Sequence, residues 1–180
     1  MAARGPDRLV LLAALAALCL PAAGVLARQL PERPPRSQPA GEPNRGLAVV
    51  PLAITTANGR VHRYRVEVAA TPEQQARGMM FRTEMARDSG MIFPMDPPRP
   101  AAFWMRNTYV PLDLVFIGKD GRVRNIAPHA RPLSEELIPS EGPVAAVLEL
   151  KGGETERIGL KPGDRVLWSP PGLGAVRQGR

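Results

Sequence analysis

Cysteine, histidine and aromatic residues are scarce in this chain of 180 residues. The one cysteine, Cys19, lies in an apolar N-terminal stretch that we expect to be removed, which leaves the mature protein without a thiol. Disulfide bonds, thiol nucleophiles and thiolate metal sites are thereby excluded. The two histidines, His62 and His129, are too few for a zinc site, which needs three or four ligands. We therefore expect no cofactor.

Apolar runs long enough to span a membrane are also lacking. The longest, Leu9 to Leu20, has about twelve residues, which suits the core of a signal peptide and falls short of the roughly 20 that a spanning helix needs. The residues Val25-Leu26-Ala27 fit a cleavage site after Ala27. These features predict a secretory signal peptide over residues 1–27 and a periplasmic or secreted protein. The alternative is a stretch that stays in place as an N-terminal membrane anchor.

The positive charge of the chain is concentrated outside its central part. The formal net charge is +7, but residues 47–170 contain sixteen lysines and arginines against fourteen acidic residues. A nearly balanced domain without a basic, aromatic stripe does not favour nucleic-acid binding, and we expect no nucleic-acid partner. The basic tails are expected to contact anionic membrane or polymer surfaces.

Composition divides the remainder of the chain into three parts. Residues 28–46 contain five prolines and no aromatic residue, which predicts a Pro-rich disordered linker. Residues 47–170 have the apolar content of one folded domain, which we expect to be a monomer, and residues 171–180 are predicted to be a disordered tail.

Short apolar stretches between turn residues predict a mainly β domain. Asn58-Gly59 is typical of a tight hairpin turn between strands over 47–55 and 60–69. Thr71, followed by Pro72 and Gln74, predicts the start of a short helix that Gly78 ends. Further strands are predicted over 90–95, 101–105, 112–117, 122–127, 144–150 and 165–169. This pattern favours a compact antiparallel β-sandwich or barrel with one or two short helices.

One stretch of the domain carries a family resemblance. From Phe103 to Asp113 the chain follows the pattern Phe-Trp-Met-x-Asn-Thr-x-x-Pro-Leu-Asp, which resembles the signature of domain of unknown function 192 (DUF192). Further matching segments occur in order along the domain, at residues 58–59, 66–69, 75–82, 90–93, 120–123, 147–150 and 163–164. The resemblance implies a small, mostly β domain that is often exported. It implies no agreed activity and supplies no catalytic residues.

The same stretch holds the first candidate site. A tryptophan with amide, hydroxyl, carboxylate and guanidinium groups around it can stack on a sugar ring and form hydrogen bonds to it. We therefore expect a non-enzymatic binding module for an envelope ligand, either glycan or protein, with the alternative that Trp104 belongs to the core. The predicted ligand-binding residues are Trp104, Asn107, Thr108, Asp113, Arg82 and Arg106.

Two carboxylates offer a second hypothesis. Asp113 and Glu149 each interrupt an apolar strand, where a carboxylate is costly unless it is paired or hydrogen-bonded. If both face one cleft, they could act as the general acid and base of a hydrolase. The alternative is structural, with each carboxylate accepting hydrogen bonds from a turn or pairing with Arg82 or Arg106.

Methionines offer a third hypothesis. Six of the seven fall between Met79 and Met105, and thioethers are soft ligands that select Cu(I). Periplasmic Cu(I) binding is therefore an alternative function, although methionine is also a common filler of irregular cores and groove walls. The candidate copper ligands are Met79, Met80, Met91 and Met105.

Overall fold

The computed structural model describes residues 41–169. The predicted signal peptide, most of the predicted linker and the predicted C-terminal tail lie outside these residues. Over the described part, the chain forms the elements β1 Val49–Thr55, β2 Val61–Val68, α1 Pro72–Arg77, β3 Ser89–Arg99, β4 Ala102–Phe103, β5 Leu112–Ile117, β6 Val123–Ala130, β7 Ile138–Pro139, β8 Val144–Lys151, α2 Glu154–Ile158 and β9 Arg165–Trp168.

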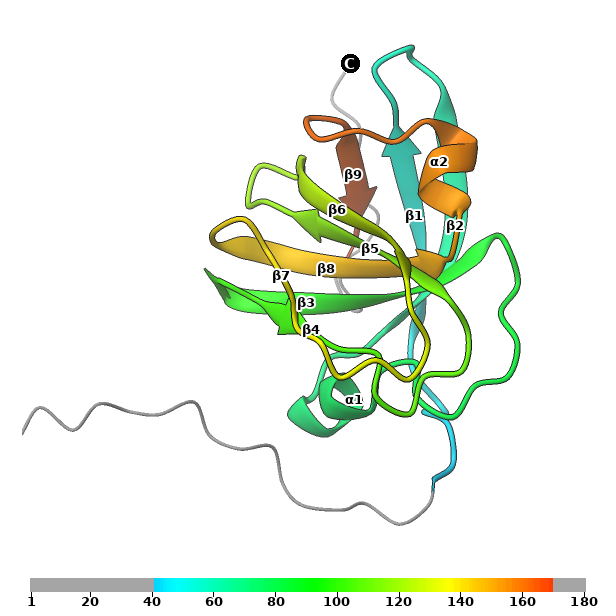
Figure 1. The fold of residues 1–180 in the computed structure, drawn as a ribbon. Helices are drawn as coiled ribbons and strands as arrows, with labels where there is room; N and C mark the ends of the chain where they lie inside the picture. Colours follow the sequence, from blue (N-terminus) through cyan, green and yellow to red (C-terminus); the bar gives the residue numbers. More distant parts are fainter. Residues whose placement is uncertain (1–40, 170–180) are drawn as a thin grey trace, which may run out of the picture. The chain divides into compact units, whose positions relative to one another are not determined.

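Seven of these strands form one mixed sheet in the order β6-β5-β8-β3-β2-β1-β9, and β4 pairs with β7 in a small second sheet (Figure 1). The predicted mainly β fold with short helices is confirmed. Six of the seven neighbouring pairs of strands are antiparallel, as expected, and β2 with β3 is the parallel one. A parallel pair needs a crossover connection, and the segment that contains α1 supplies it.

The large sheet curls so that its two edge strands approach each other. Arg122, the residue before β6, forms an isolated bridge with Arg165 of β9, and the Val166 amide donates a 2.8 Å hydrogen bond to the Gly121 carbonyl. Contact is limited to this end of the two strands, so the barrel is not closed.

Each face of the curled sheet has its own hydrophobic core. Because side chains alternate along a strand, successive residues of β5 and β8 belong to different clusters. The first cluster draws on β1, β2, β9 and α2, and includes Ile54, Val66, Val115, Leu148 and Val166. The second is covered by the segments after α1 and β4, and includes Met79, Met91, Phe93, Met105, Leu114, Phe116 and Val147.

Local sequence explains where α1 begins and ends. The Thr71 side chain accepts a hydrogen bond from the Gln74 amide, and the Gln74 side chain accepts one from the Thr71 amide, which is the predicted capping box. Gly78 ends the helix with a φ of +47°. Neither helix among residues 41–169 has the length and apolar character needed to cross a membrane.

Pro94 lies where β3 loses its parallel neighbour. Proline lacks the amide hydrogen that a sheet interior requires, so an edge or bulged strand is expected there. β2 pairs with Ser89–Ile92 only, and the pairing of β3 with β8 shifts in register between Pro94 and Arg99. The strand is therefore central in its first half and irregular after Pro94.

Candidate functional site

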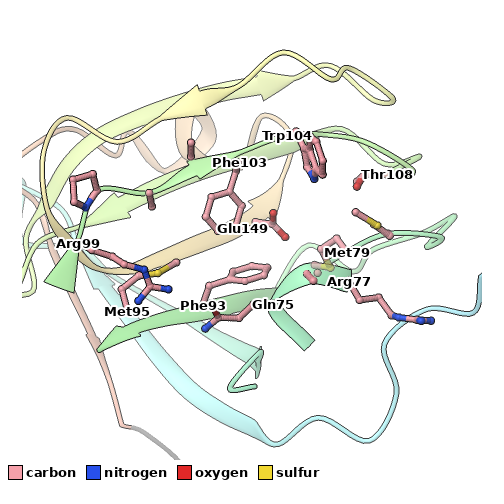
Figure 2. Close-up of a pocket in the computed structure, with 16 residues that line it drawn as sticks. Gln75, Arg77, Met79, Phe93, Met95, Arg99, Phe103, Trp104, Thr108 and Glu149 are labelled. Carbon is pink, nitrogen blue, oxygen red and sulfur yellow. The ribbon is translucent and has the colours of Figure 1, made fainter. Parts of the chain in front are cut away.

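A cavity of about 350 Å³ lies on the second core's side of the sheet, between α1, β3 and the β4 segment (Figure 2). Most of the groups that line it are apolar, and they come from five parts of the chain. The lining residues are Gln75, Ala76, Arg77, Gly78, Met79, Met80, Phe93, Met95, Arg99, Pro100, Ala101, Ala102, Phe103, Trp104, Thr108 and Glu149.

Side-chain hydrogen bonds hold α1 at one wall of the cavity. The Gln75 side-chain amide donates to the carbonyls of Ala69 (3.2 Å) and Pro94 (2.9 Å), which ties the helix to the end of β2 and to β3. The Asn44 side-chain amide donates to the carbonyls of Gln74 and Gly78 at 2.9 and 3.0 Å. These four hydrogen bonds anchor α1 to neighbouring segments, so the helix forms a fixed wall of the cavity.

Aromatic rings line the cavity from the end of α1 to the β4 segment. Phe93 of β3 and Phe103 of β4 meet edge to face with ring centroids 5.0 Å apart, and Phe103 is 6.4 Å from Phe116 in the core beneath. Trp104 follows Phe103 and is half-buried. The Arg106 guanidinium lies 5.6 Å from the centre of the Trp104 ring, so one face of the indole already carries a cation–π contact.

Glu149 is the acidic residue at the base of the cavity. It lies on β8 opposite Met91 of β3 and Leu114 of β5, and its side chain shares their face of the sheet. The residue is 4% exposed, and its Oε2 atom is buried without a hydrogen-bond partner. Figure 2 shows its carboxyl group among Phe103, Met79 and Thr108.

Burial raises the pKa of Glu149 to about 8, against the opposing effect of the Arg82 guanidinium, which lowers it. The positive charge of Arg82 is already engaged, because its Nη1 atom lies 2.6 Å from Oε2 of Glu67. Glu67 pairs in register with Met91, and Met91 pairs with Glu149, so the two glutamates flank one methionine on the same face. The trio of Glu67, Arg82 and Glu149 therefore has one acidic group more than it has cations.

Asp113 lies on the opposite face of the sheet from Glu149. It pairs with Leu150, whereas its neighbour Leu114 pairs with Glu149. Side chains of adjacent residues point to opposite faces of a strand. The structure therefore does not bring Asp113 and Glu149 into one cleft, which the hydrolase hypothesis required.

The Asp113 carboxylate is instead saturated by donors from the protein. It is fully buried, and it accepts hydrogen bonds from the amides of His129 (2.8 Å), Gly153 (3.0 Å) and Thr155 (2.8 Å) and from the Thr155 hydroxyl (2.7 Å). Burial would raise the pKa of Asp113, but these donors outweigh it and hold the pKa below its ordinary value. This is the structural alternative, in which a turn backbone satisfies the carboxylate.

Of the six predicted ligand-binding residues, Trp104 and Thr108 line the cavity, and the other four do not. Asn107 has a φ of +54° and connects two loops, because its carbonyl accepts a 2.8 Å hydrogen bond from the Phe81 amide. Arg106 is exposed and lies 3.6 Å from Glu135, and Arg82 pairs with Glu67. These residues support the walls or the base of the site.

The four candidate copper ligands are divided between the core and the cavity. Met79, Met91 and Met105 are at most 2% exposed and pack in the second hydrophobic cluster, whereas Met80 is half-buried. Met79 and Met80 line the cavity, but neither histidine does. Among the described residues, no group of three or more His, Cys, Asp or Glu is placed to hold a metal ion.

Sequence reasoning missed Phe93, Phe103 and Glu67. Phe103 begins the stretch that resembles the family signature, but the site residues predicted in that stretch did not include it. Glu67 alternates with apolar residues, a pattern that is typical of a solvent-facing charge. Its side chain is 24% exposed, because the loop that carries Arg82 folds over that face.

Comparison with known proteins places this geometry in a family. The model of the DUF192 family (Uncharacterized ACR) matches residues 53–168, a span that includes every residue lining the cavity. No curated protein matches the chain.

Two similar crystal structures cover nearly the same domain. A candidate transcription regulator from Sinorhizobium meliloti is 45% identical, with a TM-score of 0.68, and the alignment covers 69% of this chain and 97% of that one. A protein of unknown function from Novosphingobium aromaticivorans is 50% identical, with a TM-score of 0.67, and the alignment covers 74% of this chain and 94% of that one.

Proposed function

This chain belongs to the DUF192 family, and we propose that its domain is an exported, non-enzymatic module that binds a small molecule in the cavity beside Trp104. The observation that carries the proposal is the Glu149 carboxyl group, which lines the cavity with one buried oxygen that no protein donor contacts. Buried polar groups are normally hydrogen-bonded, because leaving one unpaired costs about 1–3 kcal/mol. A ligand that supplies the missing partner removes this cost.

The size and lining of the cavity support a compact, partly apolar ligand. Ligand pockets begin at roughly 300 Å³ and combine apolar walls with a few polar groups that orient the ligand. Here the walls come from the rings of Phe93, Phe103 and Trp104 and from methionine side chains, and Glu149 supplies the orienting group. A glycan would need a freely exposed stacking face, and Arg106 covers part of the indole. A small molecule therefore fits better than a polysaccharide.

The polar groups of the cavity favour binding over catalysis. Among the described residues that line it, Glu149 is the only carboxylate, and the lining contains no serine, cysteine or histidine. General acid–base hydrolysis by two carboxylates requires both to face the substrate. Asp113 lies on the other face of the sheet with its oxygens already hydrogen-bonded.

The cellular location in this proposal rests on the N-terminal sequence. An apolar run of signal-peptide length precedes a Pro-rich linker, which favours a domain that works in the cell envelope. The Sinorhizobium meliloti relative is named as a candidate transcription regulator. The near balance of charge over residues 47–170 does not support extending nucleic-acid binding to this chain.

A fragment screen observed on the protein tests the proposal. The methionine methyl groups would be labelled with ¹³C, and small aromatic and alkyl fragments would be added one at a time. We expect some fragments to shift the Met79, Met80 and Met95 methyl signals and the Trp104 indole signal, because these groups line the cavity. The Trp168 indole should not move, because it packs against the other core.

A variant that fills the cavity mouth provides the control. Ala76 is exposed and lines the cavity, so Ala76→Phe should block entry and abolish the shifts. Ala57→Phe makes the same change in the exposed β1–β2 turn and should leave the shifts intact. If no fragment perturbs the cavity signals, or if Ala76→Phe leaves them unchanged, the cavity is not a binding site.

A further inference from the structure

The acidic base of the cavity has an unbalanced charge that defines its ligand further. Glu67 and Arg82 form a close ion pair at 2.6 Å, and the same guanidinium lowers the pKa of Glu149, so one positive charge serves two carboxyl groups. Glu149 lies on the same face two strands from Glu67 and has no cation of its own. The site can reach neutrality in two ways, by holding a proton on Glu149 or by accepting a positively charged ligand.

We propose that the cavity selects a small organic amine with an apolar body, whose ammonium group pairs with Glu149. This inference rests on the proposed function and specifies its ligand class. An ammonium group brings both missing features, a hydrogen-bond donor for Oε2 and the positive charge that replaces the proton.

The cavity walls suit a cation with an attached hydrocarbon group. Phe93 and Phe103 line the cavity with aromatic rings, whose negative faces attract ammonium groups, whereas Arg106 already occupies one face of the Trp104 indole. Met79 and Met95 add polarizable sulfur and flexible apolar surface that adapts to the ligand's shape. The walls therefore stabilise both ends of an arylalkylamine or alkylamine.

The other charged groups near the cavity do not cancel this preference. Arg99 lines the mouth but is exposed, so water and salt screen its charge. Arg77 donates a hydrogen bond to the Glu42 carbonyl, and Figure 2 shows its guanidinium extending away from Glu149. Arg82, the remaining cation that acts on Glu149, is held by Glu67. The deep end of the cavity therefore remains the place for a cation.

Replacement of a proton by an amine makes binding depend on pH. Only the ionised form of Glu149 pairs with an ammonium. The apparent dissociation constant of the amine is therefore its intrinsic value divided by the fraction of protein in which Glu149 is ionised. With a Glu149 pKa of about 8, that fraction grows about tenfold per pH unit below 8 and then levels off. An alkylammonium remains charged through this range, because amine pKa values lie near 10. Close to one proton should leave for each amine bound at pH 7.

The test compares 2-phenylethylamine with its neutral analogue 2-phenylethanol on the purified protein between pH 6 and pH 8.5. Titration calorimetry in two buffers with different ionisation enthalpies would give the affinity and the number of protons released. We expect the dissociation constant of the amine to fall on the order of 50-fold over this range, and that of the alcohol to stay constant within about twofold. Glu149→Gln, which keeps the shape of the protonated side chain, should bind both probes with the same weak, pH-independent affinity.

Other results would overturn the amine proposal in recognisable ways. If the amine binds no better than the alcohol at pH 8.5, or if Glu149→Gln keeps the pH-dependent amine affinity, Glu149 does not pair with a cation. Affinity of a neutral amide such as N-benzylacetamide that falls through pH 8 would mean that protonated Glu149 is the donor to the ligand. In either case the fragment shifts at Met79 and Met95 would persist, whereas their complete absence would refute the binding function itself.

Discussion

Two carboxylates with the same sequence context have opposite environments in this fold. Asp113 and Glu149 both interrupt an apolar strand, and neither pattern nor hydropathy distinguishes them. The difference comes from which face each side chain meets and what lies there. Donors from the β6 end and the α2 start surround Asp113, whereas the cavity lies against Glu149. Those donors come from positions distant in sequence, so a single sequence could not assign the two roles.

Asp113 should stabilise the fold in a pH-dependent manner. Because the folded pKa is lowered, its contribution is present above the unfolded value near 3.9 and is lost as the pH falls through the folded pKa. Asp113→Asn places an amide group against three backbone donors. We expect a loss of about 2–4 kcal/mol in the free energy of unfolding at pH 7 and a smaller loss at pH 3, measured by urea titration.

The matched control for this variant is Asp88→Asn. Asp88 is exposed in the turn before β3, so its substitution should change the free energy of unfolding by less than about 0.5 kcal/mol. An equal loss in both variants, or a loss in Asp113→Asn that does not shrink at low pH, would contradict the role assigned to the Asp113 carboxylate.

Glu149 should have the reverse effect on stability. Its folded pKa of about 8 is above its unfolded value near 4.5, so the folded protein binds more protons between these values and loses stability as the pH rises. Glu149→Gln removes this penalty. The variant should stay within about 1 kcal/mol of the wild type near pH 5 and exceed it at pH 9 by up to about 5 kcal/mol, since each pKa unit corresponds to about 1.4 kcal/mol.

Urea titrations of both proteins at pH 5, 7 and 9 measure this effect. A wild-type stability that is flat across this range, with a constant offset from Glu149→Gln, would show that the buried carboxyl group titrates normally. Glu149 lowers the free energy of unfolding of the ligand-free protein at high pH. Such a destabilising side chain is typical of a ligand contact, because function can retain groups that stability does not favour.

At the scale of elements, local sequence patterns were sufficient to predict most turns, caps and strands. They were not sufficient to predict which strands pair with each other. The Asn58-Gly59 turn, the Thr71 cap and the buried strand Leu112–Ile117 were all predicted and are present. The two-residue strand β7 was missed, because Ile138–Pro139 has no periodic pattern. The parallel pairing of β2 with β3 was also missed, because it depends on where α1 packs.

Gly78 is the residue that allows α1 to pack beside the cavity. Its φ of +47° and ψ of −133° are rarely adopted by residues with a side chain, and a Cβ there would lie 3.3 Å from the Phe93 ring. Gly78→Ala should therefore lower the free energy of unfolding by about 3 kcal/mol in a urea titration. Gly159→Ala, at a left-handed position with nothing within 4 Å, should cost only about 1 kcal/mol.

The comparison of these two substitutions separates the cost of backbone strain at positive φ from the cost of a steric contact with Phe93. Both substitutions place a side chain at positive φ, but only the one at Gly78 brings it against an aromatic ring of the cavity wall. Gly78→Ala should also weaken the binding of cavity probes, whereas Gly159→Ala should not. Equal costs for the two variants would mean that Phe93 moves aside freely and that the wall is not fixed.

At the scale of the whole molecule, family membership and fold class were predictable and the cavity was not. The ordered motifs spread over the domain identified the family, and the short alternating strands identified a mainly β fold. The cavity lies on the face of the sheet that carries the second hydrophobic cluster. There α1 and the β4 segment cover the sheet without closing over it completely. That enclosure depends on residues as distant as Gln75, Phe103 and Glu149, which no local pattern connects.

Export of the domain is a prediction about the whole chain, and it can be tested on the protein as expressed. Cleavage after Ala27 would release a mature protein that begins at Arg28 and lacks Cys19. We expect the full chain, produced in a Gram-negative host, to appear in the periplasmic fraction with the intact mass of residues 28–180. Signal cleavage requires a small residue before the cut, so Ala27→Trp should leave a membrane-associated precursor, whereas Ala23→Trp, farther from the cut, should still be processed. If the protein is found in the cytoplasm with its full mass, the proposed location in the cell envelope is wrong. The proposed ligand chemistry of the cavity would be unaffected, because Glu149 and the walls that surround it do not depend on the compartment.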